Sequence, residues 1–213
     1  MDISMDKSRI RRQILAVRDR MDPEVRERCN AAIRERVFVH QAYREARIIL
    51  AYVSYRSEVD TSEMIGQALA DGKYVFAPKV CGGEMEFWQI FSLEDLCSGY
   101  KGIPEPVRGI PLPEWMGRPN GSAAADQGEL LQYKIMMWMP GAVFDRERHR
   151  IGYGKGFYDR YLGRLSDAKG RIGSVMERLT TAAFAYTCQL VHTIPYEVHD
   201  VRPDMVITEE GIL

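Results

Sequence analysis

The sequence contains few cysteines, and no two of them have the spacing of a metal or redox site. Its four cysteines, Cys29, Cys81, Cys97 and Cys188, are widely separated and include no C-x-x-C motif. This spacing argues against a structural zinc site, a redox dithiol and a disulfide framework. We therefore expect thiols that are buried or idle, in a reducing compartment.

Long apolar runs and an excess of either charge are also absent. No run approaches the roughly 20 apolar residues that cross a membrane, and residues 1–7 lack the apolar stretch of a secretory signal. The chain has 29 basic and 30 acidic residues and a net charge of −1, so no overall field attracts nucleic acid or an anionic membrane. We expect a cytoplasmic protein with neither partner, a monomer or weak homo-oligomer, in which any anion site is local.

Length and periodicity predict one compact domain over residues 1–213. With 46% hydrophobic residues the chain can build one substantial core. Basic and apolar residues alternate at helical spacing over 7–20, and Asp22-Pro23 predicts the N-cap and first residue of a second helix that ends near Val37. Asp60-Thr61-Ser62-Glu63 resembles a capping box, which would begin a helix ending at Asp71-Gly72.

Short apolar runs alternate with these helices and predict strands. The runs cover residues 47–53, 74–80, 85–91, 135–139, 182–186 and 205–208. The order strand, helix, strand implies a right-handed parallel crossover, whereas the strand at 85–91 is expected to be antiparallel. The prediction is an α/β fold with a mainly parallel sheet, helices on both faces in three Rossmann-like layers, and sites at the carboxyl ends of the strands. The segment 109–128 is expected to form an exposed loop.

The most informative segment is 148–160, which combines alternating glycines, cations and a carboxylate. Gly152, Gly154 and Gly156 allow backbone N–H groups to approach an anion closely, and a helix is expected from Gly156 to Leu165, with further helix up to Leu179 left open. The arginines of the segment and Lys155 suit a ligand with several phosphate oxygens. The segment is therefore predicted to form a polyphosphate cradle, with Asp159 available for magnesium.

This segment is open to other interpretations. It lacks the G-x-x-x-x-G-K-[ST] pattern and the G-x-G-x-x-G fingerprint, which leaves a glycine-rich surface turn with solvated charges as the bland alternative. A sugar-phosphate isomerase or an acyl-CoA-type transferase on a related α/β sheet would bind one phosphate there without consuming ATP. A ligand-sensing or RNA-binding module is the third alternative, disfavoured by the balanced charge.

The chain resembles the 5-formyltetrahydrofolate cyclo-ligase family, whose members are also called 5,10-methenyltetrahydrofolate synthetases. The similarity is most specific over 139–145, Met-Pro-Gly-Ala-Val-Phe-Asp, and 150–159, Arg-Ile-Gly-Tyr-Gly-Lys-Gly-Phe-Tyr-Asp. Weaker similarities lie at 7–11, 58–61, 102–106 and 194–200. The long segment after Pro113 departs from the family pattern, and Phe157 stands where tyrosine is common.

The resemblance implies an ATP-dependent and magnesium-dependent ring closure of 5-formyltetrahydrofolate, part of one-carbon metabolism. It implies that Lys155 and Arg150 act on the transferred phosphoryl group. The residues expected to bind ATP are Lys7, Arg11, Arg150, Gly152, Gly154, Lys155, Gly156, Phe157 and Tyr158. Taken alone, Lys7 and Arg11 lie one turn apart on a helix and are also typical of a solvated helix face.

The resemblance also implies the folate and metal residues. Glu58 matches the family's folate-binding acid, although a charge at the helix entry is an alternative interpretation. Val53 and Tyr153 are expected to line the folate side of the site. Asp159 and Asp200 are the implied magnesium carboxylates, because Mg²⁺ prefers one or two carboxylates together with phosphate oxygens and water. Asp159 as a first-turn residue that complements a helix dipole is the alternative. No histidine, serine or cysteine is assigned a catalytic part.

Overall fold

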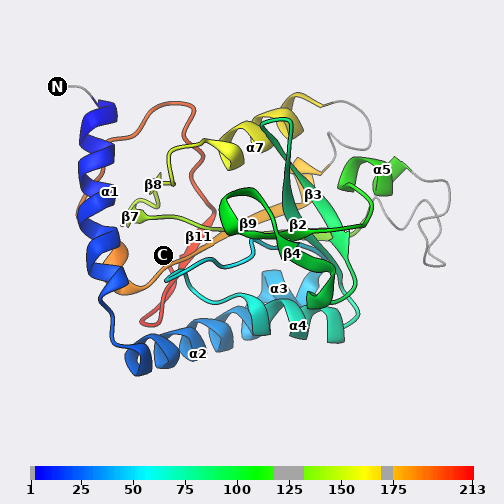
Figure 1. The fold of residues 1–213 in the computed structure, drawn as a ribbon, viewed down its shortest axis with the longest axis horizontal. Coiled ribbons are helices and arrows are strands. Elements are labelled where there is room, and N and C mark those ends of the chain that lie inside the picture. Colours follow the sequence, from blue (N-terminus) through cyan, green and yellow to red (C-terminus); the bar gives the residue numbers. More distant parts are fainter. Residues whose placement is uncertain (1–2, 118–131, 169–174) are drawn as a thin grey trace.

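The chain folds around a six-stranded sheet with the strand order β11-β9-β6-β1-β2-β3. The structure, a computed structural model, describes residues 3–117, 132–168 and 175–213 (Figure 1). The strands of this sheet are β1 (Ala46–Leu50), β2 (Tyr74–Cys81), β3 (Glu84–Ile90), β6 (Lys134–Met139), β9 (Leu179–Phe184) and β11 (Met205–Ile207). Only the β2–β3 pair is antiparallel, as the sequence predicts.

The two central strands are apolar on both faces because helices cover both faces. Ile48, Ile49 and Leu50 of β1 are fully buried, and they pair with the equally buried residues 135–137 of β6. Continuous apolar strands of this kind are typical of parallel sheets inside α/β proteins. The central position of β1 and β6 places their carboxyl ends next to each other.

Helices form the outer layers. The described α-helices are α1 (Ile3–Asp19), α2 (Pro23–Val39), α3 (Gln41–Glu45), α4 (Ser62–Ala70), α5 (Leu112–Gly117) and α7 (Phe157–Asp167). Figure 1 shows α2, α3 and α4 on one side of the sheet and α7 on the other, and each side has its own buried apolar cluster. The three-layer prediction is confirmed. None of these described helices is long and apolar enough to cross a membrane.

Two small sheets were not predicted. One pairs β4 (Leu96–Ser98) with β5 (Pro104–Pro106), and the other has the order β10-β7-β8. The strands of the second are β7 (Val143–Asp145), β8 (Arg150–Ile151) and β10 (Leu190–Val191). Ile10, Ile14 and Leu15 of α1 pack against this second sheet. Strands of two or three residues are too short to give a periodic signal in the sequence, although these ones hold α1 beside residues 150–156.

Several local predictions were wrong. The strand expected over 47–53 ends at Leu50, and the one expected over 182–186 begins at Leu179 and ends at Phe184. The segment expected as an exposed loop contains the short helix α5, in which Leu112, Trp115 and Met116 are buried. The rest of that loop, from residue 118 on, lies outside the described residues, as does part of the segment up to Leu179, which was left open as helix.

The capping box at 60–63 is also wrong in its contacts. Thr61 is the N-cap of α4 but makes no side-chain cap bond. Its hydroxyl donates to the Tyr52 carbonyl at 2.9 Å, and the Ser62 N–H is instead accepted by Asp60 at 2.9 Å. Of the four thiols expected to be buried or idle, Cys81 and Cys97 are exposed, and Cys29 and Cys188 are partly buried.

The N-cap predicted at Asp22 is confirmed. Its carboxylate accepts the N–H groups of Glu24 at 2.9 Å and Val25 at 3.2 Å, and Pro23 begins the helix. We expect Asp22→Ala to lower the free energy of unfolding by about 1 kcal/mol in urea denaturation, because two helical N–H groups lose their acceptor. Asp22→Asn keeps an acceptor and is the matched control; equal losses for both variants would contradict this role.

Candidate active site

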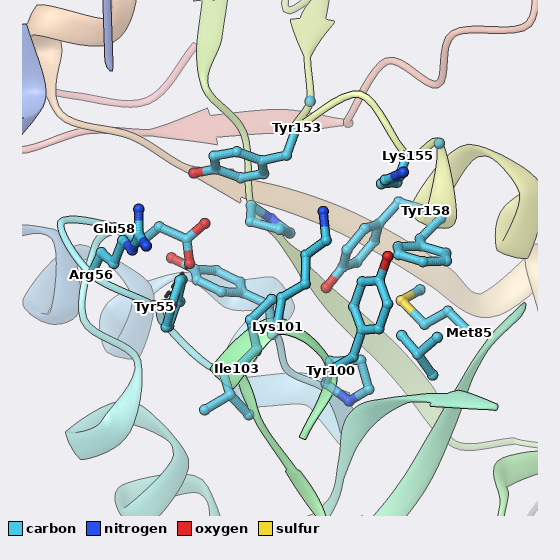
Figure 2. A pocket seen from close by; sticks show the side chains of 18 of the residues that line it. Tyr55, Arg56, Glu58, Met85, Tyr100, Lys101, Ile103, Tyr153, Lys155 and Tyr158 are labelled. Carbon is cyan, nitrogen blue, oxygen red and sulfur yellow. Dashed lines mark hydrogen bonds between the residues drawn. The ribbon is translucent and has the colours of Figure 1, made fainter. Parts of the chain in front are cut away.

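A pocket of about 340 Å³ opens at the carboxyl ends of β1, β2 and β6. Its walls come from α1, from the segments that follow β1 and β6, from the β2–β3 hairpin, from residues 100–105 and from the amino end of α7. The charged side chains that line it are Arg18, Asp19, Arg56, Glu58, Lys101, Glu105, Arg150, Lys155 and Asp159. Figure 2 shows cations and tyrosines from several of these elements pointing into one space.

Residues 152–156, here called the glycine segment, form the upper wall of the pocket in Figure 2 and end at the start of α7. Gly154 and Gly156 have positive φ, +88° and +61°, and Gly156 is the N-cap of α7. A Cβ at Gly154 would lie 3.3 Å from an Arg11 nitrogen, so a larger residue would crowd α1. Gly156 has no side chain to cap the first turn of α7, which leaves N–H groups and the positive end of the helix dipole beside the pocket.

Arg150 is a buried cation that holds this segment to α7. One terminal nitrogen donates to Asp159 at 2.8 Å and the other to the Pro140 carbonyl at 3.3 Å. Its Nε is buried and has no hydrogen-bond partner in the described structure. Because Arg150 also lines the pocket, its charge favours an anionic ligand there.

Lys155 and Lys101 reach the pocket from opposite walls. No carboxylate of the described residues lies within ion-pair distance of either ammonium group; Lys101 lies 5.6 Å from the ring centre of Tyr100. Figure 2 shows the Lys101 side chain pointing into the pocket, across from the segment that carries Lys155. Lys101 has a left-handed backbone, φ +57°, of the kind that often marks functional sites. Two cations without a carboxylate partner therefore face the pocket space.

Glu58 and Tyr153 form the other end of the pocket. Glu58 accepts the Tyr55 N–H at 2.8 Å. Burial raises the pKa of the Glu58 carboxyl, while hydrogen bonds from Tyr153 and the Tyr55 N–H and the charge of Arg18 oppose the rise. Burial and the neighbouring Glu58 charge raise the pKa of the Tyr153 hydroxyl, so this hydroxyl stays protonated at neutral pH. A carboxylate and a phenol thus lie together opposite the two lysines.

The chain was compared with known proteins. The profile of the 5-formyltetrahydrofolate cyclo-ligase family matches residues 3–209. The chain belongs to this family. It is 25% identical to the 5-formyltetrahydrofolate cyclo-ligase of Mus musculus, covering 90% of this chain and 87% of the relative, and 27% identical to the mitochondrial one of Arabidopsis thaliana, covering 97% and 74%.

A solved structure shares the fold. The 5,10-methenyltetrahydrofolate synthetase of Aquifex aeolicus superimposes with a TM-score of 0.72 at 24% identity, over 97% of this chain and 91% of that one. The cyclo-ligase family therefore accounts for both the sequence and the architecture. Since one relative is mitochondrial, the cytoplasmic location stays a prediction.

Most residues that the family resemblance assigns meet in the pocket. Those that line it are Val53, Glu58, Arg150, Gly152, Tyr153, Lys155, Gly156, Phe157, Tyr158 and Asp159. Gly154 is not among the lining residues, although it belongs to the same segment. The sequence does not place residues 150–159 relative to Glu58, which lies about a hundred positions earlier in the chain. The carboxyl ends of the parallel strands bring them together.

Lys7, Arg11 and Asp200 do not line the pocket. Arg11 donates to the Gly152 carbonyl at 2.7 Å, so it contacts the glycine segment. Lys7 contacts Asp200 at 2.5 Å and Glu197 at 3.0 Å. Burial lowers the pKa of Lys7, but the two carboxylates outweigh this effect and raise it, while the Lys7 ammonium holds the pKa of Asp200 below its usual value. The predicted helix face is engaged with the protein and is not simply solvated.

The two implied metal carboxylates each keep one oxygen free of described contacts. Oδ1 of Asp159 accepts from Arg150 and from the Val201 N–H at 3.0 Å. Oδ2 of Asp200 accepts from Lys7 and from the Glu197 N–H at 2.7 Å. Val201 follows Asp200 in the chain, so the segment that carries Asp200 passes beside Asp159. Glu197, His199 and Asp200 also place possible ligand atoms within 4.8 Å of one another.

Several pocket residues were missed by the sequence analysis. Arg18, Tyr52, Tyr55, Arg56, Tyr100, Lys101, Ile103 and Glu105 line the pocket without having been assigned to it. The run Gly-Ile-Pro-Glu-Pro at 102–106 was a family match and gave a signal for Ile103 and Glu105. Arg18 and Lys101 gave none, because an arginine on an amphipathic helix and a lysine in a loop are ordinarily solvated.

Proposed function

We propose that this chain closes the ring of 5-formyltetrahydrofolate to give 5,10-methenyltetrahydrofolate, with ATP converted to ADP and phosphate. The observation that supports this most is one pocket with two chemically different ends. Glu58 and Tyr153 lie at one end, and Lys155 lies at the other, beside Gly156 and the amino end of α7 (Figure 2). A carboxylate accepts hydrogen bonds from the N–H edge of a pterin, whereas cations and glycine N–H groups suit a triphosphate.

The reaction needs activation because the formyl oxygen is a poor leaving group. Transfer of the γ-phosphoryl to that oxygen breaks the β–γ phosphoanhydride bond and leaves an iminium phosphate. The N10 amine then attacks the formyl carbon and loses its proton, and phosphate departs with the C–O electron pair. Negative charge on the moving phosphoryl is the main quantity that the site must stabilise.

Lys155 and Arg150 are the groups proposed to meet this charge. Lys155 has no described carboxylate partner, so its ammonium is free to follow the phosphoryl oxygens. Arg150 is fixed by Asp159 and Pro140, with a buried Nε that still lacks an acceptor. A fixed guanidinium beside a flexible ammonium can bind the polyphosphate tail and also adapt as the phosphoryl group moves. Arg11, which donates to the Gly152 carbonyl, and Lys7, one turn away on α1, are proposed to bind ATP with them.

Glu58, Tyr153 and Val53 are proposed to bind the folate. Val53 follows β1 and is buried in the pocket wall, where it offers an apolar surface to a pterin ring. Glu58 is fixed by the Tyr55 N–H and gives the wall its acceptor for pterin N–H groups. The two ends together would bring the formyl group toward the phosphate side.

The residues fit a magnesium ion. Asp159 and Asp200 each retain one oxygen without a described partner, and carboxylates supplemented by phosphate oxygens and water suit Mg²⁺. When bound, the ion would neutralise polyphosphate charge. Arg150 and Lys7 hold the two carboxylates in place through their other oxygens.

A spectroscopic assay tests this function. Purified protein with 5-formyltetrahydrofolate and Mg-ATP is expected to develop the near-ultraviolet absorbance band of methenyltetrahydrofolate, with one ADP released per product. Omission of ATP is the control and should give no band. Absence of the band together with turnover of a sugar phosphate or an acyl-CoA without ATP would contradict the proposal and favour an isomerase or transferase.

A further inference from the structure

Arg18 near the end of α1 is a buried cation without a direct carboxylate partner among the described residues. It exposes 4% of its surface and lies in the pocket wall. Its Nε donates to the Ser57 hydroxyl at 3.0 Å and its Nη1 to the Tyr153 hydroxyl at 2.8 Å. Burial of a charge against neutral hydroxyls is costly, so a purely structural position on this helix would be better served by an apolar residue.

The contacts of Arg18 connect three segments of the pocket. They join α1 to Ser57, in the segment after β1 that also carries Glu58, and to Tyr153 in the glycine segment. The Ser57 hydroxyl donates its proton to Asp19, and its oxygen accepts the hydrogen bond from Arg18. Asp19 therefore balances the charge of Arg18 only indirectly, through the Ser57 hydroxyl between them. The guanidinium also lines the pocket, where its positive charge acts on the neighbouring groups.

Arg18 also determines which way the Tyr153 hydroxyl donates. An arginine has no acceptor, so the Tyr153 oxygen accepts from Arg18 and its proton must point elsewhere. The Gly141 carbonyl lies 3.5 Å from this hydroxyl, and the Glu58 carboxyl is a neighbour whose pKa the hydroxyl lowers. Arg18 thus turns the Tyr153 proton away from α1, toward the side of the pocket that holds Gly141 and Glu58.

We propose that Arg18 is a positioning residue for folate recognition: it fixes the ring of Tyr153 and the carboxylate of Glu58 in the single arrangement that receives the pterin. This inference rests on the proposed function and deepens it. Arg18 acts through Tyr153 and Glu58, the groups assigned to contact substrate.

The charge state of Glu58 gives the inference a pH signature. The groups that face Glu58 are Arg18 from α1, Tyr52 after β1, Arg56 beside it, Tyr153 from the glycine segment and Tyr158 from α7. Burial raises the pKa of Glu58, and Arg18 is the cation that opposes this rise. Loss of Arg18 therefore raises the pKa further, and the ionised carboxylate is lost at a higher pH as the solution is acidified.

Arg18→Met, with Arg12→Met as matched control, tests the proposal. Arg12 lies on the exposed face of the same helix. In Arg18→Met we expect the KM for 5-formyltetrahydrofolate to rise on the order of tenfold to a hundredfold, as for a lost hydrogen bond to a charged network. We expect kcat to change by less than about threefold, and the acid limb of kcat/KM to move to higher pH. Arg12→Met should match the wild type.

A second comparison separates positioning from simple support of the helix. In a Glu58→Gln background, which has no carboxyl to ionise, Arg18→Met should add little to KM and should shift no acid limb. Tyr153→Phe removes, at nearly constant volume, the hydroxyl that Arg18 holds and that lowers the pKa of Glu58. It should therefore move the acid limb in the same direction even if Arg18→Met folds poorly. Arg18→Lys should recover part of the affinity.

Two results would overturn the inference. One is an Arg18→Met enzyme with the KM and pH profile of Arg12→Met; the other is an Arg18→Met effect of the same size with and without Glu58. Both leave the proposed function intact, because wild-type turnover of 5-formyltetrahydrofolate with ATP is measured in the same assay. Absence of that turnover would instead reject the proposed function.

Discussion

Lys155→Met is expected to lower kcat by about 10²- to 10³-fold, the usual loss when one preorganised donor to a developing negative charge is removed. The KM for 5-formyltetrahydrofolate should change little, because Glu58 and Tyr153 lie at the other end of the pocket (Figure 2). The lysine has no described carboxylate partner, so its removal leaves no unpaired acid. The free energy of unfolding should therefore remain close to that of the wild type. The measurement is initial-rate absorbance kinetics together with urea denaturation.

Lys79→Met is the matched control for this experiment. Lys79 is a lysine of β2 whose ammonium lies 4.5 Å from the ring centre of Trp88, outside the pocket lining. Lys79→Met removes one positive charge, as Lys155→Met does, so a general electrostatic effect would reduce the activity of both variants. Full turnover in Lys155→Met would show that the phosphoryl charge is stabilised by other groups and would reject the role assigned to Lys155.

Arg150→Met is expected to reduce both stability and ATP binding. Arg150 is 8% exposed, and its guanidinium contacts Asp159 at 2.8 Å. Removal of one partner from a buried ion pair costs about 3 kcal/mol or more, because the other charge is left unpaired. Calorimetry should show that ATP affinity falls by at least about tenfold, as expected for a lost charge-assisted contact to phosphate.

The double variant Arg150→Met/Asp159→Asn separates these two effects. Replacement of the carboxylate removes the unpaired charge, so the double variant should regain much of the stability lost in the single variant. ATP binding without magnesium should stay weak, since the guanidinium is still missing. If ATP affinity returned together with stability, Arg150 would have only a structural role, and the phosphate site would have to be sought elsewhere.

Local signals in the sequence were enough to predict the framework. The central strands are apolar without interruption because both faces are covered, and Asp22-Pro23 marks a helix start through bonds to residues two and three positions away. The glycine segment and the helix after it are equally local, since Gly156 directly precedes α7. Very short strands and the helix at 112–117 escaped prediction because a few residues carry too little periodic information.

The sequence by itself determined the sheet, its covering helices and the glycine segment that we propose binds phosphate, because each depends on neighbours in the chain. Only the tertiary structure decided which side chains meet. Arg18 contacts residues 39 and 135 positions away, and Lys7 pairs with an acid 193 positions away. Such pairings depend on how the layers pack and where the parallel strands end, and no local pattern encodes them. For this reason the ligand classes that we propose for the two ends of the pocket come from motifs, whereas the proposed part of Arg18 comes from the fold.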